Sequence, residues 1–143
     1  MDFLWLVFAL LSAITASLVA IFGKIGLKSI DSNAATAIRA VIMAIFLFGV
    51  VVIQGKLKLL PEIFSDKKTL GFIVLSGIAG ASSWLFYFLA LKHGSVSKVA
   101  PVDKLSVVIS TLLAILILGE KVNKTNLLGV GIITVGVVIV ALS

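Results

Sequence analysis

The sequence contains no cysteine, and only two of its 143 residues are proline. Without thiols, disulfide bridges and thiolate metal sites are excluded, and the redox compartment stays open. The single histidine, His93, has no carboxylate within a few residues of it. No metal-ligand cluster, phosphate-binding glycine loop or nucleophile elbow occurs along the chain. These shortages predict a protein that is not an enzyme and that uses no cofactor or metal.

Charged residues are scarce and unbalanced, whereas apolar residues are abundant. Hydrophobic residues make up 61% of the chain and charged residues only 13%, with a net charge of +6. A typical soluble domain is roughly half apolar and about a quarter charged, so a soluble chain of this size could not bury so much apolar surface. The lysines lie between apolar blocks, where membrane proteins meet lipid headgroups. The composition therefore predicts a lipid bilayer as the partner and argues against nucleic acid.

Long apolar runs recur five times along the chain. A helix rises about 1.5 Å per residue, so about 20 residues cross a hydrocarbon core of about 30 Å. The runs are continuous and do not alternate, which excludes membrane strands. We therefore predict an all-α integral membrane bundle of five transmembrane helices, forming one domain over residues 1–143. The predicted spans are 3–23, 34–54, 69–91, 98–118 and 125–142.

The first run begins the chain but differs from a cleaved signal peptide. Asp2 is the only charge before it, and the run is longer than the usual apolar core of such a peptide. We therefore expect it to be retained as the first span.

The lysine and arginine residues are evenly divided between the two faces of the predicted bundle. The face of the N-terminus carries Lys56, Lys58, Lys67, Lys68, Lys121 and Lys124. The opposite face carries Lys24, Lys28, Arg39, Lys92, Lys98 and Lys104. Orientation normally follows an excess of these residues on the cytoplasmic side. If Arg39 and Lys104 are embedded, six against four favours a cytoplasmic N-terminus; otherwise the tie indicates insertion both ways and pairing with an inverted copy.

Several segments, taken in order, resemble one repeat of a known family. They are "AIFGKIGL", "ATAIRAVIMAIFLF" and the stretch from "FYFLALKHGSVSKVAPVDK" through "LGEKVNKTNLLGVG" to the end of the last span. Their order and spacing are similar to a single EamA-type repeat of the drug/metabolite transporter superfamily. Most members carry two five-helix repeats of opposite orientation, and this chain has one.

The resemblance implies a function and an assembly. It implies a membrane solute carrier for small metabolites or drug-like solutes that works by alternating access. Two copies would then do the work of two repeats, as an antiparallel homodimer in the plasma (inner) membrane of a prokaryote. Inverted repeats around a site near the midplane are a general transporter design.

A few polar and aromatic residues within the spans are candidates for binding the solute. Arg39 and Asp103 lie at similar depth in spans that begin on the same face, so we expect Asp103 to pair with Arg39 or with Lys104, and Arg39 is the better placed of the two. Adjacent helical residues diverge by about 100°, which would leave Lys104 free to attract an anionic group of the solute. Ser97 as a helix cap would place Pro101 in the first turn, where its missing N–H costs little. The candidate substrate-binding residues are Arg39, Ser83, Trp84, Tyr87, Asp103, Lys104, Ser106 and Ser110.

Other interpretations of the same residues stay open. Asp103 and Lys104 are also typical of the headgroup-level start of a helix, and the small residues of the third span are typical of tight helix packing. Gly129 and Gly136 leave a smooth seam that favours a dimer or bundle contact. A non-transporting membrane scaffold or assembly protein remains an alternative. A proton-coupled small multidrug-type exporter is disfavoured, because the first span contains no acidic residue.

Overall fold

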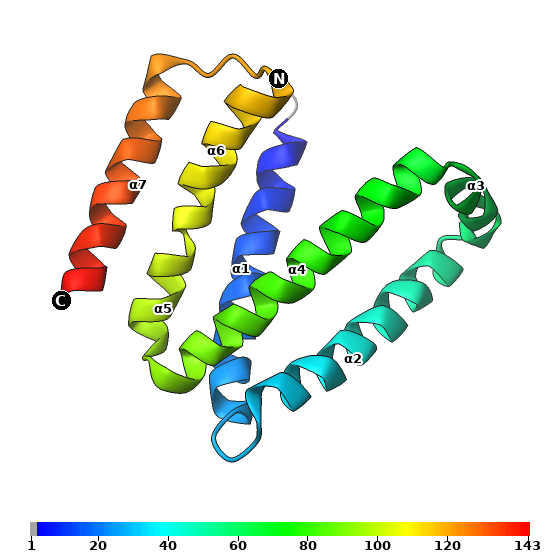
Figure 1. Cartoon of the computed structure of the whole chain (residues 1–143), viewed down its shortest axis with the longest axis horizontal. Helices are drawn as coiled ribbons and strands as arrows, with labels where there is room; N and C mark the ends of the chain where they lie inside the picture. Colours follow the sequence, from blue (N-terminus) through cyan, green and yellow to red (C-terminus); the bar gives the residue numbers. More distant parts are fainter. Residues whose placement is uncertain (1–2) are drawn as a thin grey trace. The chain divides into compact units, whose positions relative to one another are not determined.

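The computed structural model describes residues 3–143, and their regular structure is entirely helical (Figure 1). Five helical segments are long and apolar enough to cross a membrane, which confirms the all-α fold with five spans. Met1 and Asp2 lie outside the described residues. The spanning helices are α1 (Leu4–Gly26), α2 (Ser32–Ile53), α4 (Lys67–His93), α5 (Val96–Asp103) with α6 (Leu105–Leu118), and α7 (Lys124–Leu142).

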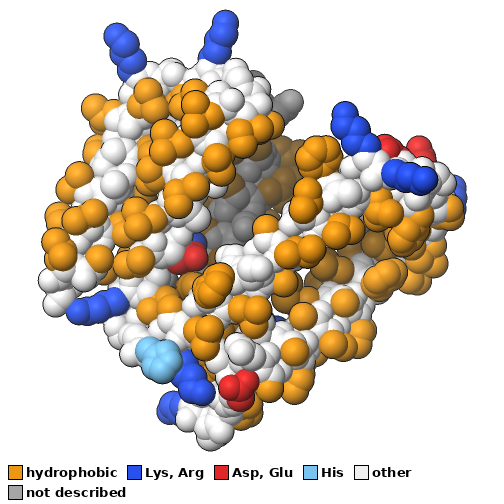
Figure 2. Space-filling view, viewed as in Figure 1, with side chains coloured by type: hydrophobic (Ala, Val, Ile, Leu, Met, Phe, Trp, Pro, Cys, Tyr) orange, Lys and Arg blue, Asp and Glu red, His pale blue; other side chains and the backbone are white. Residues whose placement is uncertain are grey.

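The spanning helices expose large apolar side chains over most of their length. Phe46 is 69% exposed and Leu116 is 78% exposed. Figure 2 shows hydrophobic side chains along the helices and most lysine and arginine side chains at helix ends. The hydroxyls of Thr111 and Thr134 each donate to the carbonyl oxygen four residues earlier at 2.9 Å, so they need no outside partner in hydrocarbon. Such a surface suits lipid contact, and the chain is a multi-pass membrane protein.

The chain divides into two compact units, each of which is described separately. One unit, called here the α5–α7 unit, holds α1 up to Ile21 together with His93–Ser143. In it α5 and α6 both pack against α7. The other, called here the α2–α4 unit, is Phe22–Lys92 and contains the last turn of α1. There η1 (Leu57–Leu59) and α3 (Leu60–Ser65) connect α2 to α4, which runs back alongside α2 (Figure 1). The single domain over residues 1–143 stays a prediction.

The start of α2 is set by a side-chain cap. Asp31 accepts hydrogen bonds from the backbone N–H groups of Asn33 at 3.0 Å and Ala34 at 2.9 Å. The Ala34 N–H is the main cause that holds the pKa of Asp31 below its ordinary value. Because this pKa is lowered, the cap stabilises the fold fully at pH values above the ordinary pKa of aspartate. This stabilisation is lost as the pH falls through the lowered pKa. At neutral pH the cap therefore fixes the turn that leads to Thr36 and Arg39.

The fourth span is broken, contrary to the expectation of one continuous helix. Ser95 is the N-cap in place of Ser97, so Pro101 lies inside α5 and not in its first turn. Proline donates no N–H to the preceding turn, which weakens the helix there. The backbone N–H of Lys104 then donates to the carbonyl oxygen of Pro101 at 3.0 Å, which closes a tighter turn than that of an α-helix. The next helix, α6, begins one residue later. Asp103 and Lys104 consequently lie at an interruption of the span.

Candidate functional site

A groove of about 540 Å³ lies between α2 and α4, within the α2–α4 unit. Alanine and glycine recur on both facing sides at helical spacing, and their short side chains leave the space open. The volume falls in the range of about 300–1,000 Å³ that small-molecule sites occupy. The lining residues are Asn33, Thr36, Ala37, Arg39, Ala40, Met43, Ala44 and Leu47 of α2, and Gly77, Gly80, Ala81, Trp84 and Leu85 of α4.

The groove is polar at one end and apolar at the other. Asn33, Thr36 and Arg39 line the end near the start of α2. The Thr36 hydroxyl donates to the Ser32 carbonyl at 2.8 Å, so its hydrogen is already used within the helix. Leu47 lies eight residues beyond Arg39, which is roughly 12 Å along a helix axis. A bound molecule would therefore meet a cation at one end and hydrocarbon at the other.

Arg39 is held between α2 and α4 by stacking on aromatic rings. Its Cζ lies 4.0 Å from the ring centroid of Trp84 and 3.9 Å from that of Phe88. These two rings are nearly parallel, with an angle of 15° and centroids 5.6 Å apart. Tyr87 meets both edge-on, at 6.0 Å from Trp84 and 5.6 Å from Phe88. Cation–π attraction of about 0.5–2 kcal/mol per contact keeps the guanidinium at this position.

The guanidinium keeps unused hydrogen-bonding capacity. Its Nε and Nη1 atoms are buried and have no hydrogen-bond partner among residues 3–143. No acidic side chain is among the described residues that line the groove with Arg39. Unmet buried donors and an uncompensated charge both cost free energy in a poor solvent. The geometry is therefore ready for an acceptor that the unit itself does not supply.

The last turn of α1 fixes the position of the Phe88 ring. Phe88 is only 3% exposed, and a Cβ atom added at Gly23 would lie 2.2 Å from its Cε1 atom. The ring therefore occupies the space that a side chain at Gly23 would need. Lys24 Nζ also donates to the backbone carbonyl of Leu91, close to the end of α4. These contacts join the two helix ends and hold the surface on which Arg39 stacks.

The structure brings together some of the predicted site residues. Arg39 and Trp84 line the groove, and Tyr87 joins them through its ring contacts. Ser83 is exposed on α4 and is not among the residues that line this groove. Asp103, Lys104, Ser106 and Ser110 belong to the α5–α7 unit, and both serines are exposed on α6.

Lys104 pairs with Asp103, which makes it the second of the two partners expected for that carboxylate. Its Nζ lies 3.3 Å from Oδ2 of Asp103, with the two side chains 55% and 36% exposed. Neighbouring helical side chains diverge by about 100°, but the lysine side chain is long enough to reach back to the carboxylate beside it. A pair this exposed contributes about 0–1 kcal/mol. The pair of Arg39 with Asp103 involves both units and stays a prediction.

Sequence reasoning missed Phe88 and the alanines of α2 that open the groove. Phe88 follows Trp84 by four residues, so the helical repeat already puts both rings on one face. Ala37, Ala40 and Ala44 follow the same logic on α2. These signals are present in the sequence, but small and aromatic residues also serve ordinary packing.

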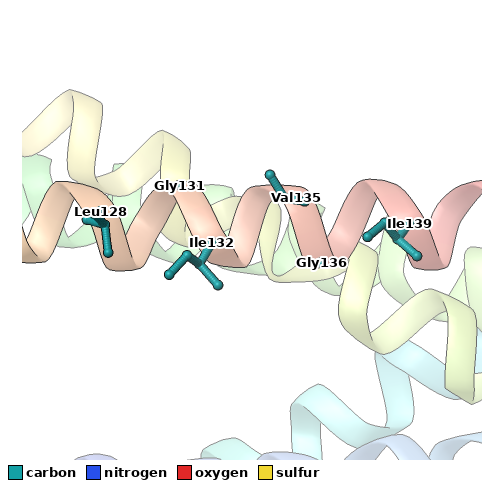
Figure 3. A pocket seen from close by; sticks show the side chains of 6 residues that line it. All are labelled: Leu128, Gly131, Ile132, Val135, Gly136 and Ile139. Atoms are coloured by element: carbon teal, nitrogen blue, oxygen red, sulfur yellow. The ribbon is translucent and has the colours of Figure 1, made fainter.

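A second depression, of about 620 Å³, lies on α7 in the α5–α7 unit. Figure 3 shows that all of its lining residues come from this one helix. They are Leu128, Gly131, Ile132, Val135, Gly136 and Ile139. None of these side chains is polar, so the depression has no group that could orient a solute. Gly136 lines this depression together with Gly131, whereas Gly129 does not, and the dimer or bundle contact expected at Gly129 and Gly136 stays a prediction.

Comparison with known proteins identifies the family of the chain. Residues 3–142 match the EamA-like transporter family. A protein of a Sinorhizobium species, named as an uncharacterized transporter in the cobO 3' region, is 43% identical over 137 residues, 96% of each chain. An uncharacterized protein of Methanocaldococcus jannaschii is 28% identical over 81 residues, which is 57% of this chain and 59% of that one. No solved structure matches the chain. The chain belongs to the EamA-like transporter family.

Proposed function

We propose that the protein is a solute carrier that moves small metabolites or drug-like solutes by alternating access, as an antiparallel homodimer in the plasma membrane of a prokaryote. Membership of the EamA-like family and a relative named as a transporter support transport itself. The observation that carries the site is the groove between α2 and α4 with the Arg39 guanidinium on its wall.

The position of Arg39 favours a role in binding over a role in anchoring the helix. Arg39 lies seven residues after the first residue of α2, roughly 10 Å along the helix. A charged side chain at such depth is costly and in membrane proteins usually marks a solute or ion pathway. The small residues around it would let α2 and α4 shift against each other when the halves of the carrier rock around a central site.

The single five-helix repeat found in the chain and its charge distribution support the homodimer. One chain supplies one five-helix repeat, whereas alternating access in this class of fold uses two repeats of opposite orientation. With Arg39 left out because it lies within the span, the lysines are divided six against five between the two faces, too small a difference to fix one orientation. The apolar face of α7 around Gly131 and Gly136 offers a close-packing surface for a helix of the second copy.

Transport is tested with purified protein in sealed liposomes. We expect saturable flux for at least one class among amino acids, organic acids, sugars, nucleobases and cationic drugs, measured with and without a pH gradient. Protein-free liposomes and liposomes that contain heat-inactivated protein are the controls. Absence of flux for every class would contradict the carrier and favour the scaffold or assembly protein.

The antiparallel arrangement predicts that the C-terminus is found on both sides of the membrane. A protease-sensitive tag after Ser143 should be cleaved from outside in about half of the molecules in sealed vesicles. Lys121→Gln with Lys124→Gln removes two cations from the N-terminal face and should move the C-terminus toward the cytoplasm. The matched pair Lys28→Gln with Lys92→Gln should move it the opposite way. A single orientation in every variant would exclude the antiparallel dimer.

A further inference from the structure

We infer that the solute of the α2–α4 groove is a carboxylate with a short apolar tail, bound with its carboxylate on Arg39 and its tail along Met43 and Leu47. The inference rests on the proposed function, because it names the chemical class of the solute for the same site. It goes beyond that function in stating a charge, a polarity and an orientation.

The positive charge of Arg39 favours an anionic solute in the groove. Arg39 is the one charged side chain among its described lining residues. The guanidinium contacts the rings of Trp84 and Phe88, but its Nε and Nη1 atoms have no hydrogen-bond acceptor. A carboxylate is a charged acceptor that forms charge-assisted hydrogen bonds with guanidinium N–H groups, and the aromatic rings supply no such acceptor. A cationic solute would be repelled, and a neutral solute would leave the charge uncompensated.

The shape and the apolar lining of the groove favour a solute with a short apolar tail. Beyond Arg39 the groove is lined by apolar side chains, with Met43 and Leu47 on α2 and Gly77 on α4. Only Asn33 and Thr36 add polar side chains, and both lie at the end toward the start of α2. The tail would therefore replace water along the apolar stretch and contribute affinity in proportion to the apolar area it covers. A sugar or another polyhydroxylated solute would find few partners there.

Two sources share this ligand chemistry, a soluble short-chain acid and a fatty acid of the bilayer. We assign the soluble acid, since a groove of about 540 Å³ suits a small solute. The experiment distinguishes the two sources by offering hexanoate from solution and palmitate from the membrane.

Trp84 provides a direct reporter of binding. The chain has two tryptophans, and Trp5 is 69% exposed on α1. A Trp5→Phe variant leaves Trp84, whose ring centroid is 4.0 Å from the Arg39 guanidinium carbon. In phosphatidylcholine nanodiscs, its fluorescence should change saturably with hexanoate. Hexanoate should bind about tenfold or more tightly than hexanamide, because only the acid forms a charge-assisted pair, and hexylamine should not compete.

Two substitutions test the two ends of the groove separately. In the Trp5→Phe background, Arg39→Gln should abolish the preference for hexanoate over hexanamide, and Arg39→Lys should restore part of it. Gly77→Leu should weaken the binding of hexanoate but not that of propionate. A Cβ at Gly77 meets no heavy atom within 4 Å, so the leucine can be accommodated and would occupy the space of the longer tail. This second variant leaves Arg39 untouched, so it tests the tail even if Arg39→Gln folds poorly.

The outcomes separate this inference from the proposed function. Equal binding of hexanoate and hexanamide would overturn the inference, even if the liposomes show flux of another solute class. Selective hexanoate binding without any flux would uphold the inference about the site and contradict the carrier. If palmitate in the nanodisc displaces hexanoate at low mole fraction, the assignment to a soluble acid is overturned.

Discussion

Arg39→Gln is expected to lower the transport efficiency, kcat/KM, by about 10–100-fold while leaving the protein folded. The physical reason is the loss of a charge-assisted hydrogen-bond pair to the solute, which is worth about 1.5–3 kcal/mol. Arg39→Lys keeps the charge but loses the planar guanidinium and its contacts with the rings. Its kcat/KM should therefore lie between that of the unsubstituted protein and that of Arg39→Gln. The measurement is initial flux in liposomes, with thermal unfolding of each variant recorded in parallel.

The same variant distinguishes two accounts of how the Arg39 charge is compensated. If only the rings of Trp84 and Phe88 stabilise the guanidinium, Arg39→Gln removes a cation that has no anionic partner. The free energy of unfolding should then change by no more than about 1–2 kcal/mol. If Arg39 pairs with Asp103, Arg39→Gln and Asp103→Asn should each cost about 3–5 kcal/mol, and the double variant should recover part of that. Additive effects in the double variant would exclude the pair.

Gly23→Ala is expected to destabilise the protein by about 1–3 kcal/mol, since it overpacks a filled site. The new Cβ would lie 2.2 Å from Cε1 of Phe88, whose ring is almost fully buried and so has little room to move. A displaced ring would also disturb the surface under Arg39, so solute binding should weaken with stability. Thermal unfolding and the Trp84 fluorescence titration measure the two effects.

Gly26→Ala provides the matched control three residues further along α1. A Cβ at Gly26 meets no heavy atom within 4 Å, so the change should be neutral or raise stability by up to about 1 kcal/mol through helix propensity. Phe88→Leu removes the ring atoms that the Gly23 methyl would strike, so Gly23→Ala should cost less in that background. Equal costs for Gly23→Ala and Gly26→Ala would show that Phe88 does not limit the site.

The sequence by itself determined the membrane setting and the five helices. Hydrocarbon thickness imposes a length of about 20 apolar residues on every span, and that length can be read from the runs without any tertiary contact. Arg39 was identifiable for a similar reason, since a cation within an apolar run is costly and in membrane proteins usually marks a solute or ion pathway. The Asp31 cap was likewise local, because its partners Asn33 and Ala34 follow it directly.

Only the tertiary structure decided which groups surround these residues. Trp84 is 45 positions after Arg39, and their contact depends on α4 running back beside α2. The role of Gly23 appears only when the Phe88 ring is seen to fill its missing side-chain space. Asp103 and Lys104 pair although neighbouring helical side chains diverge, because the lysine side chain reaches back to the carboxylate. Apolar periodicity specifies which residues of a helix face inward. Whether two facing helices pack closely or leave a groove between them depends on the side-chain volumes on both helices.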